Sequence, residues 1–512
     1  MAMNAPTGVT ADTLAAVAAA LASPGAVTAS DALLAKTATT QGISTTTGLV
    51  GYLLEAPAKN LFPVLSPLRN RFARHGAPIG ATAVNWKAIT AINAAKVKAG
   101  VAEGVRNTGV STSEIDRTQT FKDFGLDDLV TFRAIDAGRG FEDVRAMSTA
   151  NLLSAVMVEE EKLLLGGNVT ALGAVTFVDG NITDVGAATP AGPFTASTQY
   201  DFAVTALTSY GYLNSAKGHV SADASDETAG QTVIATHSLA GSRTSVTLAW
   251  AAKRGAVAYN VYAGAHSAAM YYLGTVTATK CTIVTTAGST AATFVAATNG
   301  QALIVDALPT APTGVPNTAD QTADALSFDG VIPQIEAAAG NGYYKDALGL
   351  TLNGDNAGGM TEVDTMLQYL YDNSRIGPTL LLVNSQQGRD MLTKIAMNGT
   401  TTTLRLTAAV DPSGVIRGGL RLGSYLNKYT GTDMDIMTHP YMAPGTIVAL
   451  SERLPFPNNN VPNPFEVEVL REYTQYDWAM VQRRYEFGVY GTEALKCYFP
   501  AGCGVITGLN AG

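Results

Sequence analysis

The side chains that could do chemistry in this sequence form no recognisable catalytic or metal-binding group. No G-x4-G-K-[ST], G-x-G-x2-G or G-x-S-x-G pattern occurs, so the phosphate-binding and nucleophile motifs are missing. The five histidines have no H-x3-H or HExxH spacing, which a zinc site would favour; they are His75, His219, His237, His266 and His439. We therefore expect no enzyme activity, no cofactor and no metal site.

The cysteines and one glycine-rich stretch have ordinary structural explanations. Cys497 and Cys503 have no second pair at zinc-finger spacing, and Cys281 lies far from both, so we expect three buried thiols. Asn353–Gly359 (NGDNAGG) lacks the spacing and the closing glutamate of a calcium loop, so we expect a surface turn.

Two groups of charged residues remain. Glu159–Glu161 occupy consecutive positions of an expected helix, where side chains point about 100° apart, so we expect them on a solvated face. Arg69, Arg71, Arg74 and the pair Arg483-Arg484 could contact phosphate or carboxylate groups. These arginines could bind nucleic acid, but we favour a role in salt bridges between subunits.

The length and composition of the chain limit the number of domains and the class of protein. The chain has 512 residues, which at about 100–200 residues per domain indicates about three domains. Charged residues make up 15%, below the roughly 25% of typical soluble domains, so much of the surface is expected to be neutral or covered by partners. A net charge of −9 argues against a dedicated nucleic-acid binder. The alanine-rich stretch Leu14–Leu21 fits neither a signal peptide nor a membrane helix, so we expect a soluble, unexported protein.

The elements expected in the first third of the chain are mostly extended. We expect residues 1–50 to form an arm. Leu54–Arg74 is expected to form a stiff, proline-containing tract that needs a neighbour to cover it. Ala83–Phe121 predicts a two-stranded ribbon with a flexible tip, which is marginal in water unless it lies on another surface. Phe141–Leu165 predicts a long helix that ends at Gly166-Gly167.

From Asn168 to about Asp320 the sequence is rich in Ala, Thr, Gly and Val, and short alternating strands predict an antiparallel sandwich. The T-L-x-W motif at Trp250, followed by Ala258–Tyr262, resembles strands B and C of fibronectin type III modules. Tyr200–Ala206 resembles strand F, which here precedes B and C, so a rearranged or composite module is one interpretation.

The last third mixes helices and strands, and a β-sheet crossed by helices is the economical fold for Leu326–Leu450. A capping-box-like start at Thr361–Asp364 predicts one helix. The other expected elements are a buried strand at Thr379–Asn384, a helix from Ser385 to about Asn398, and strands at Phe465–Tyr473 and within Trp478–Tyr490.

Several segments, in this order, resemble the major capsid proteins of tailed bacteriophages with the Hong Kong 97 fold. Leu53–Arg71 is similar to the tract that leads into the extended loop of these proteins, and Ala83–Phe121 is similar to that loop. Phe141–Leu165 resembles the spine helix of their peripheral domain. Gly377–Leu392 resembles the strand and helix of the axial domain, and Val481–Leu509 resembles the terminal strand and tail.

The resemblance implies an α+β chain with the Hong Kong 97-type capsid fold and an inserted all-β immunoglobulin-like sandwich. The expected parts are an N-terminal arm (1–53), a proline-rich lead-in (54–82), an extended β-hairpin loop (83–121), a peripheral domain with the spine helix (122–168), the inserted sandwich (169–321), an axial domain (322–450), and a return to the peripheral domain with the tail (451–512). We expect the insert to enter through flexible residues at Gly166-Gly167 and Thr310–Asp324, to face outward, and to be dispensable for the shell lattice.

The resemblance also implies a virion capsid subunit, assembled in the host cytoplasm with copies of itself into hexamers and pentamers around packaged double-stranded DNA. DNA would touch the inner face non-specifically, scaffold, portal and decoration proteins are further implied partners, and no membrane is involved. Glu55–Arg74 and the loop Ala83–Phe121 should lie across neighbouring subunits instead of folding back into their own domain. The candidate interface residues are Pro57, Phe62, Arg69, Arg71, Trp86, Phe121, Arg483 and Arg484.

Some family members join a loop lysine to an asparagine by an isopeptide bond. Lys87, Lys96 and Lys98 lie in the expected loop, but no asparagine matches the partner motif, so we predict no cross-link. Two other classes of protein are alternatives to the capsid hypothesis. An exported bacterial surface or adhesion protein predicts an export signal and tandem modules, and an enzyme needs convergent titratable groups; the sequence offers neither.

Overall fold

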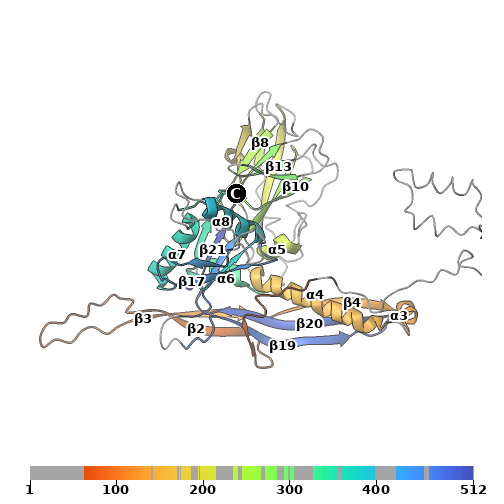
Figure 1. The fold of residues 1–512 in the computed structure, drawn as a ribbon, viewed down its shortest axis with the longest axis horizontal. Helices are drawn as coiled ribbons and strands as arrows, with labels where there is room; N and C mark the ends of the chain where they lie inside the picture. Colours follow the sequence, from red (N-terminus) through yellow and green to blue (C-terminus); the bar gives the residue numbers. More distant parts are fainter. Residues whose placement is uncertain are drawn as a thin grey trace, which may run out of the picture. The chain divides into compact units, whose positions relative to one another are not determined.

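The computed structural model is a mixed α+β chain, and its described residues form five β-sheets with helices packed on them (Figure 1). It describes residues 61, 63–139, 142–169, 172, 175–185, 194, 197–214, 235–239, 245–266, 271–284, 293–297, 300–304, 327–337, 340–355, 359–397, 422–454 and 460–510. The expected arm, Pro57 and Phe62 lie outside these residues.

A four-stranded sheet, called the long sheet here, has the order β1-β19-β20-β4. Its strands are β1 (Ala73–Gly76), β19 (Phe465–Asp477), β20 (Arg484–Cys497) and β4 (Lys122–Thr131). β1 pairs with β19 in parallel, and the other pairs are antiparallel. The two strands predicted near the C-terminal end of the chain are therefore confirmed, and each is longer than its sequence pattern indicated.

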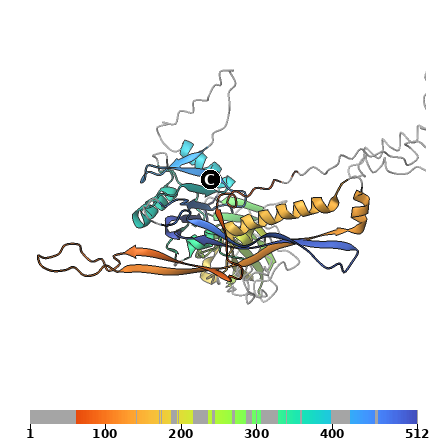
Figure 2. The ribbon, with the colours of Figure 1, turned by 90° about the horizontal axis from the view of Figure 1, so that it is seen from below.

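Helix α4 (Val144–Gly166) lies along the long sheet, after the short helix α3 (Phe132–Gly138) (Figures 1 and 2). The predicted long helix is confirmed, but it begins three residues later than expected. The reason is Asp143, whose Oδ1 accepts hydrogen bonds from the amides of Arg145 and Ala146, both at 3.1 Å. Leu152 and Val156 pack on Val130, Phe487 and Val489 of the sheet; together they form a small core.

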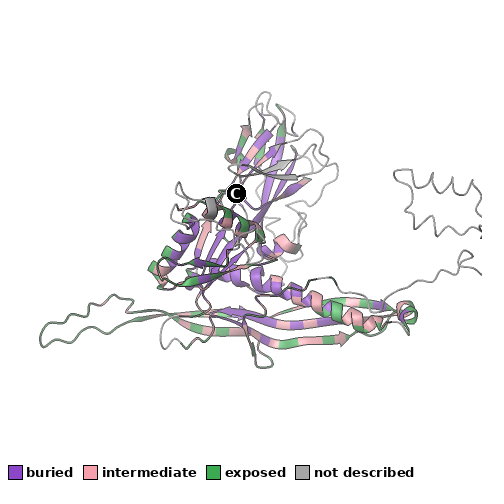
Figure 3. Cartoon of the chain, in the orientation of Figure 1, coloured by how far each residue is buried: buried purple, intermediate pink, exposed green. Residues whose placement is uncertain are grey.

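The predicted two-stranded excursion is also confirmed. Strands β2 (Ala83–Ile92) and β3 (Thr112–Thr120) pair with each other in antiparallel register and form a separate two-stranded sheet, called the ribbon here. The base of the ribbon lies against β20, and the rest extends away from the other sheets (Figures 1 and 2). Figure 3 shows that most of its residues are exposed or half-buried.

The six-stranded central sheet has the order β14-β21-β18-β15-β17-β16. Its strands are β14 (Tyr343–Asp346), β21 (Gly504–Thr507), β18 (Ile447–Leu450), β15 (Leu380–Val383), β17 (Asp433–Thr438) and β16 (Ser424–Leu426). Helices α6 (Val331–Glu336), α7 (Thr361–Ser374) and α8 (Ser385–Met397) belong to the same part of the chain. The expected sheet crossed by helices is therefore present.

Two details of this part differ from expectation. β21 pairs with β14 and β18, so it belongs to the central sheet although we had expected all of 451–512 to return to the peripheral domain. Helix α7 has Met360 at its N-cap, without a side-chain cap. Asp364 instead accepts hydrogen bonds from Tyr425 and Lys428, both at 2.7 Å, so this carboxylate is not available for a capping box.

Residues 182–304 contain two further sheets. One has the order β10-β9-β6-β7 and the other β12-β13-β11-β8-β5. The strands are β5 (Ile182–Val185), β6 (Gln199–Leu207), β7 (Ala235–Ser238), β8 (Ser245–Ala249), β9 (Ala258–Ala265), β10 (Tyr271–Val276), β11 (Lys280–Val284), β12 (Thr293–Ala297) and β13 (Gly300–Ile304). Residues from both sheets, including Phe202, Leu248, Val261 and Ile283, share one core, so two packed sheets are present as predicted. The expectation of a wholly antiparallel sandwich is wrong, because β11 and β13 pair in parallel.

The segments entering and leaving the sandwich lie side by side. The amide of Gly330 donates to the carbonyl of Gly167 at 2.8 Å, and the amide of Val169 donates to Asp329 Oδ1 at 2.8 Å. Gly166 and Gly167 are buried, so the expectation of a flexible entrance there is wrong. A Cβ added at Gly167 would lie 2.5 Å from the carbonyl oxygen of Phe328, and one added at Gly166 would collide with the side chain of Ser209, so both positions require glycine. The expected exit at Thr310–Asp324 lies outside the described residues.

The sandwich also packs on the rest of the chain. Arg254, in the turn before β9, donates through Nε to the carbonyl of Glu336 in α6, and its guanidinium lies 5.6 Å from the centre of the Tyr344 ring. Tyr210, in the short helix α5 (Ser209–Asn214), donates to Glu159 of α4 at 3.4 Å. These contacts fix the sandwich at two places besides its entrance.

The close approach at the entrance gives a first prediction. A Cβ added at Gly330 would lie 2.5 Å from the carbonyl oxygen of Leu163 and 2.8 Å from that of Leu164, both backbone atoms. We expect Gly330→Ala to lower the free energy of unfolding by about 1–3 kcal/mol, measured by urea denaturation. The control is Gly180→Ala, where nothing lies within 4 Å of the added atom. Equal stability of the two variants would contradict the tight entrance.

Candidate assembly surfaces

The part of the ribbon beyond its base exposes several large apolar side chains. Ile89 is 62% exposed and Ile92 is 76% exposed, and Val101, Val105 and Val110 in the connecting segment are also exposed. Burying each such side chain elsewhere stabilises by about 1.5–3 kcal/mol, so leaving them in water is unfavourable. We call Ile89–Val110 the distal ribbon; it is the clearest candidate contact surface among the described residues.

The base of the ribbon packs within its own chain. The Trp86 ring meets the ring of Tyr498, just after β20, edge-on at 6.1 Å between centroids. The amide of Phe121, which directly follows β3 at this same base, donates to the carbonyl of Thr82 at 3.3 Å. We had expected Trp86 to contact a neighbouring subunit; the structure places this half-buried ring against its own chain.

The described part of the lead-in, Pro63–Gly76, likewise packs on its own chain. Leu68 and Phe72 are buried in a core shared with α4, α6 and both the long and central sheets. Phe72 stacks on Phe465 of β19 with centroids 5.3 Å apart. The expectation that this segment would lie across a neighbour instead of its own domain is therefore wrong for Leu68–Gly76, because its apolar side chains complete an intrachain core and β1 extends the long sheet.

The lead-in arginines have carboxylate partners within the chain. Arg69 Nε lies 2.7 Å from Glu160, and Arg74 bridges Glu160 and Glu493, the latter at 2.8 Å. Arg71 forms a two-pronged contact with Glu452 at the surface. These pairs connect segments of one subunit, whereas we had favoured salt bridges between subunits.

The placement of Glu160 and Glu161 corrects the sequence interpretation. Both side chains are 0% exposed, so the expected solvated face is wrong at these two positions. Glu161 accepts hydrogen bonds from the amides of Leu68 at 2.8 Å and Arg69 at 2.9 Å, and lies 2.7 Å from His439 Nε2. Consecutive helix positions allow this because each carboxylate faces a different partner.

Burial raises the pKa of Glu493 to about 8, and the nearby Glu160 carboxylate adds to the rise while Arg74 opposes it. This raised pKa was not predictable from the sequence, because the carboxylates and their arginines come from three distant segments. The arginine cluster at 69–74 and the glutamates at 159–161 are both evident in the sequence, but no local pattern indicates that they form ion pairs.

The turn that joins β19 and β20 exposes a second group of large apolar side chains. Trp478, Met480 and Val481 are exposed there. Arg483 is exposed, and Arg484 pairs with Glu486 on its own strand. Arg484 thus has an intrachain partner, while Arg483 lies on an open surface.

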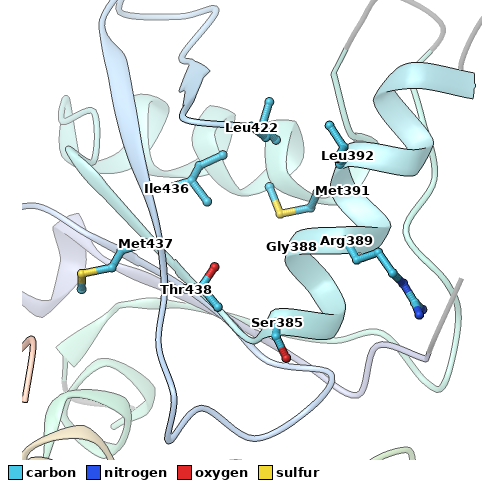
Figure 4. A pocket seen from close by; sticks show the side chains of 9 residues that line it. All are labelled: Ser385, Gly388, Arg389, Met391, Leu392, Leu422, Ile436, Met437 and Thr438. Carbon is cyan, nitrogen blue, oxygen red and sulfur yellow. The ribbon is translucent and has the colours of Figure 1, made fainter. Parts of the chain in front are cut away.

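A groove of about 550 Å³ between α8 and β17 is mainly apolar (Figure 4). Its lining residues are Ser385, Gly388, Arg389, Met391, Leu392, Leu422, Ile436, Met437 and Thr438. Within the described ranges, no cluster of three or more His, Cys, Asp or Glu could hold a metal ion, and no helix is long and apolar enough to cross a membrane.

The cysteines match expectation. All three thiols are free and buried, as predicted. Burial raises the pKa of Cys281 and Cys503 to about 12 and that of Cys497 well above its ordinary value, so these thiols are poor nucleophiles. The glycine-rich stretch is described only at Asn353–Asp355 and Gly359, where Gly354 pairs with Met360 in a β-bridge and Gly359 is buried, so the expected surface turn stays a prediction. In this stretch, Asp355 pairs with Lys428.

The solved structures similar to this chain include phage capsids and an encapsulin. The capsid of Cyanophage P-SCSP1u matches with 5% identity and a TM-score of 0.37, over 92% of this chain and 96% of that one. Mycobacterium phage Bobi matches with 9% identity and a TM-score of 0.37, over 92% and 100%. The holo-SrpI encapsulin complex from Synechococcus elongatus PCC 7942 matches with 8% identity and a TM-score of 0.36, over 90% and 94%. No protein-family model and no curated protein matches the sequence.

Proposed function

We propose that this chain is the major capsid protein of a tailed bacteriophage, a subunit that assembles with copies of itself into hexamers and pentamers of an icosahedral shell around double-stranded DNA. The observation that carries the proposal is the distal ribbon. A two-stranded ribbon is marginal in water by itself, and this one adds exposed Ile89, Ile92, Val101, Val105 and Val110. A neighbouring subunit would supply the missing cover.

The long sheet offers a surface of suitable chemistry for a neighbour's ribbon. Trp478 Nε1 and the Tyr490 hydroxyl both donate to Asp127 Oδ1, at 3.2 and 2.9 Å, which places aromatic rings beside a carboxylate. The distal ribbon combines its apolar residues with the exposed lysines Lys96 and Lys98. Apolar contact flanked by opposite charges would fix both affinity and register.

The sandwich fits the role of an inserted immunoglobulin-like module. In such modules strands C and F share one sheet and strand B lies in the other. Here β9 pairs with β6, the strands that resemble C and F, and β8, which resembles B, lies in the second sheet. We propose that this module, about 169–321, faces outward because an inward module on every subunit would crowd the DNA. The tight entrance argues against its being freely dispensable.

The other parts of the proposal follow from the resemblance in the order of segments. The arm is 1–53, the lead-in 54–82, the loop 83–121, and the peripheral domain 122–168 with most of 451–512. The axial domain is 322–450 with β21 added. Scaffold, portal and decoration proteins would be partners during assembly in the host cytoplasm. The net charge of −9 favours sparse, non-specific contact with packaged DNA. None of these parts requires an enzymatic function.

The test is the size of the purified full-length chain. We expect capsomers, closed shells or larger aggregates by light scattering and electron microscopy. A stable 53.0 kDa monomer at high concentration would overturn the proposal and favour the surface-protein alternative.

A further inference from the structure

The two sheets of the sandwich each end in an edge strand on the same side of the module. Strand β7 ends the sheet β10-β9-β6-β7 and β5 ends the sheet β12-β13-β11-β8-β5, so each pairs on one side only within the described residues. Ile182 of β5 and Ala235 of β7 both belong to the shared core. Because side chains alternate along a strand, Asp184 and His237, two positions further on, also point between the sheets.

His237 bridges these two edges through both nitrogens of its ring. Nε2 lies 3.0 Å from Asp184 Oδ1. Nδ1 lies 2.6 Å from Oδ1 of Asp179, in the short 3-10 helix η2 (Asp179–Asn181) just before β5. The side chains of His237 and Asp184 are only 14% and 10% exposed. We call His237, Asp179 and Asp184 the sandwich clasp.

The observed geometry of the clasp requires a positive charge on His237. An ionised carboxylate only accepts hydrogen bonds, and a neutral imidazole has one N–H and one lone pair. Neutral His237 can therefore donate to one aspartate but presents its lone pair to the other. The imidazolium donates at both nitrogens and forms two charge-assisted hydrogen bonds. Loss of the proton breaks one of the two links between the edges.

The charged groups described on the elements around His237 have partners of their own. β7 contacts β6 and η2. On β6, Tyr200 stands opposite His237 in register and is buried in the core. The next residue, Asp201, accepts from Thr236 at 2.7 Å and lies 2.9 Å from His266 Nδ1. His266, which directly follows β9, is therefore the competing group, because it can titrate in the same range of pH.

The strands beside β5 add no opposing charge to the clasp. β8, which pairs with β5, contains no charged residue. Lys280 of β11 stands opposite Ala249 of β8, and β11 is two strands away from β5. The local charge balance is thus one imidazolium against the two aspartates of the clasp.

We propose that the sandwich clasp is a proton-controlled link, which holds the β5 and β7 edges together while His237 is protonated and loosens them when the proton is lost. Two facing carboxylates favour the charged ring. Burial lowers the pKa of His237, but the hydrogen bonds to Asp179 and Asp184 outweigh this effect and raise the pKa above its ordinary 6.5. The link is therefore complete below about pH 6.5 and is lost as pH rises through the raised pKa. It lies within one subunit, so it does not depend on shell assembly.

Hydrogen exchange of the full-length chain, followed by mass spectrometry, tests the clasp. The probes are peptides covering β7 and β5, with a peptide of α7 as internal reference and intrinsic exchange rates divided out at each pH. We expect the protection of both probes relative to α7 to be constant up to about pH 6.5. It should then fall by up to about tenfold per pH unit until His237 has lost its proton. Relative protection that does not change with pH would overturn the proposal.

Three variants separate the clasp from the neighbouring histidine. His237→Gln keeps one hydrogen bond but cannot titrate, so relative protection should be lower than in the unmodified chain below about pH 6.5 and independent of pH. Asp184→Asn retains the histidine and removes one carboxylate, so most of the slope should disappear. The matched control His266→Gln should keep the full slope. If His237→Gln or Asp184→Asn keeps the full slope, or if His266→Gln loses it, the proposal is wrong.

Discussion

A chain carrying both Ile89→Asp and Ile92→Asp should remain soluble and folded but should form no particles. Both side chains are exposed within one subunit, so aspartate there costs the isolated subunit little. If they are covered by a neighbour, each charge would be trapped in an apolar contact at a cost of several kcal/mol, and the contact recurs at every subunit of a shell. Electron microscopy and light scattering measure the loss of particles, and circular dichroism checks the fold.

The control for this experiment is Val178→Asp. Val178 is also a large exposed apolar residue, at 51% exposure, but it lies just before the sandwich strand β5 (Ile182–Val185). We expect this variant to form particles as the unmodified chain does. Normal particles from the ribbon variant would show that the distal ribbon is not an interface.

Removing the carboxylate of Glu161 should produce a large loss of subunit stability. Glu161→Ala leaves the buried amides of Leu68 and Arg69 and the Nε2 hydrogen of His439 without their acceptor. An unsatisfied buried donor costs about 1–3 kcal/mol, so we expect the free energy of unfolding to fall by about 3–5 kcal/mol.

Urea denaturation of soluble subunit measures this change, with Glu472→Ala as the exposed control. Glu472 should change stability by less than about 0.5 kcal/mol because it is a surface position. A loss below about 1 kcal/mol for Glu161→Ala would contradict the role of Glu161 as a buried acceptor.

The elements that were predictable from the sequence are those with a local signal. The long helix has an uninterrupted pattern closed by Gly166-Gly167, and α4 ends there. The alternation on both sides of a polar, glycine-containing tip predicted Ala83–Phe121, and β2 and β3 pair across that tip. Local periodicity and turn residues suffice for such elements because neighbouring residues decide them.

The tight entrance, and the ion pairs of the buried carboxylates with the lead-in arginines, were not predictable in this way. Arg74 lies 419 residues from Glu493 in sequence, and His439 lies 278 residues from Glu161. A run of glutamates on a helix is ordinarily solvated, and only long-range packing places Glu160 and Glu161 inside. A glycine pair likewise indicates a helix end, but it does not reveal whether the backbone there is mobile or pressed against Ser327–Gly330.

The position of β21 has a consequence for the time course of synthesis. β21 (Gly504–Thr507) lies between β14 (Tyr343–Asp346) and β18 (Ile447–Leu450), so the central sheet stays in two pieces until residues 504–507 have left the ribosome. The parallel pairing of Ala73 with Glu466 adds a second late contact between distant segments. Contacts so far apart in sequence form slowly, because a long loop must close before they stabilise anything. We therefore expect a nascent chain to remain unable to join its neighbours until translation has passed Thr507, which would keep assembly from starting on the polysome.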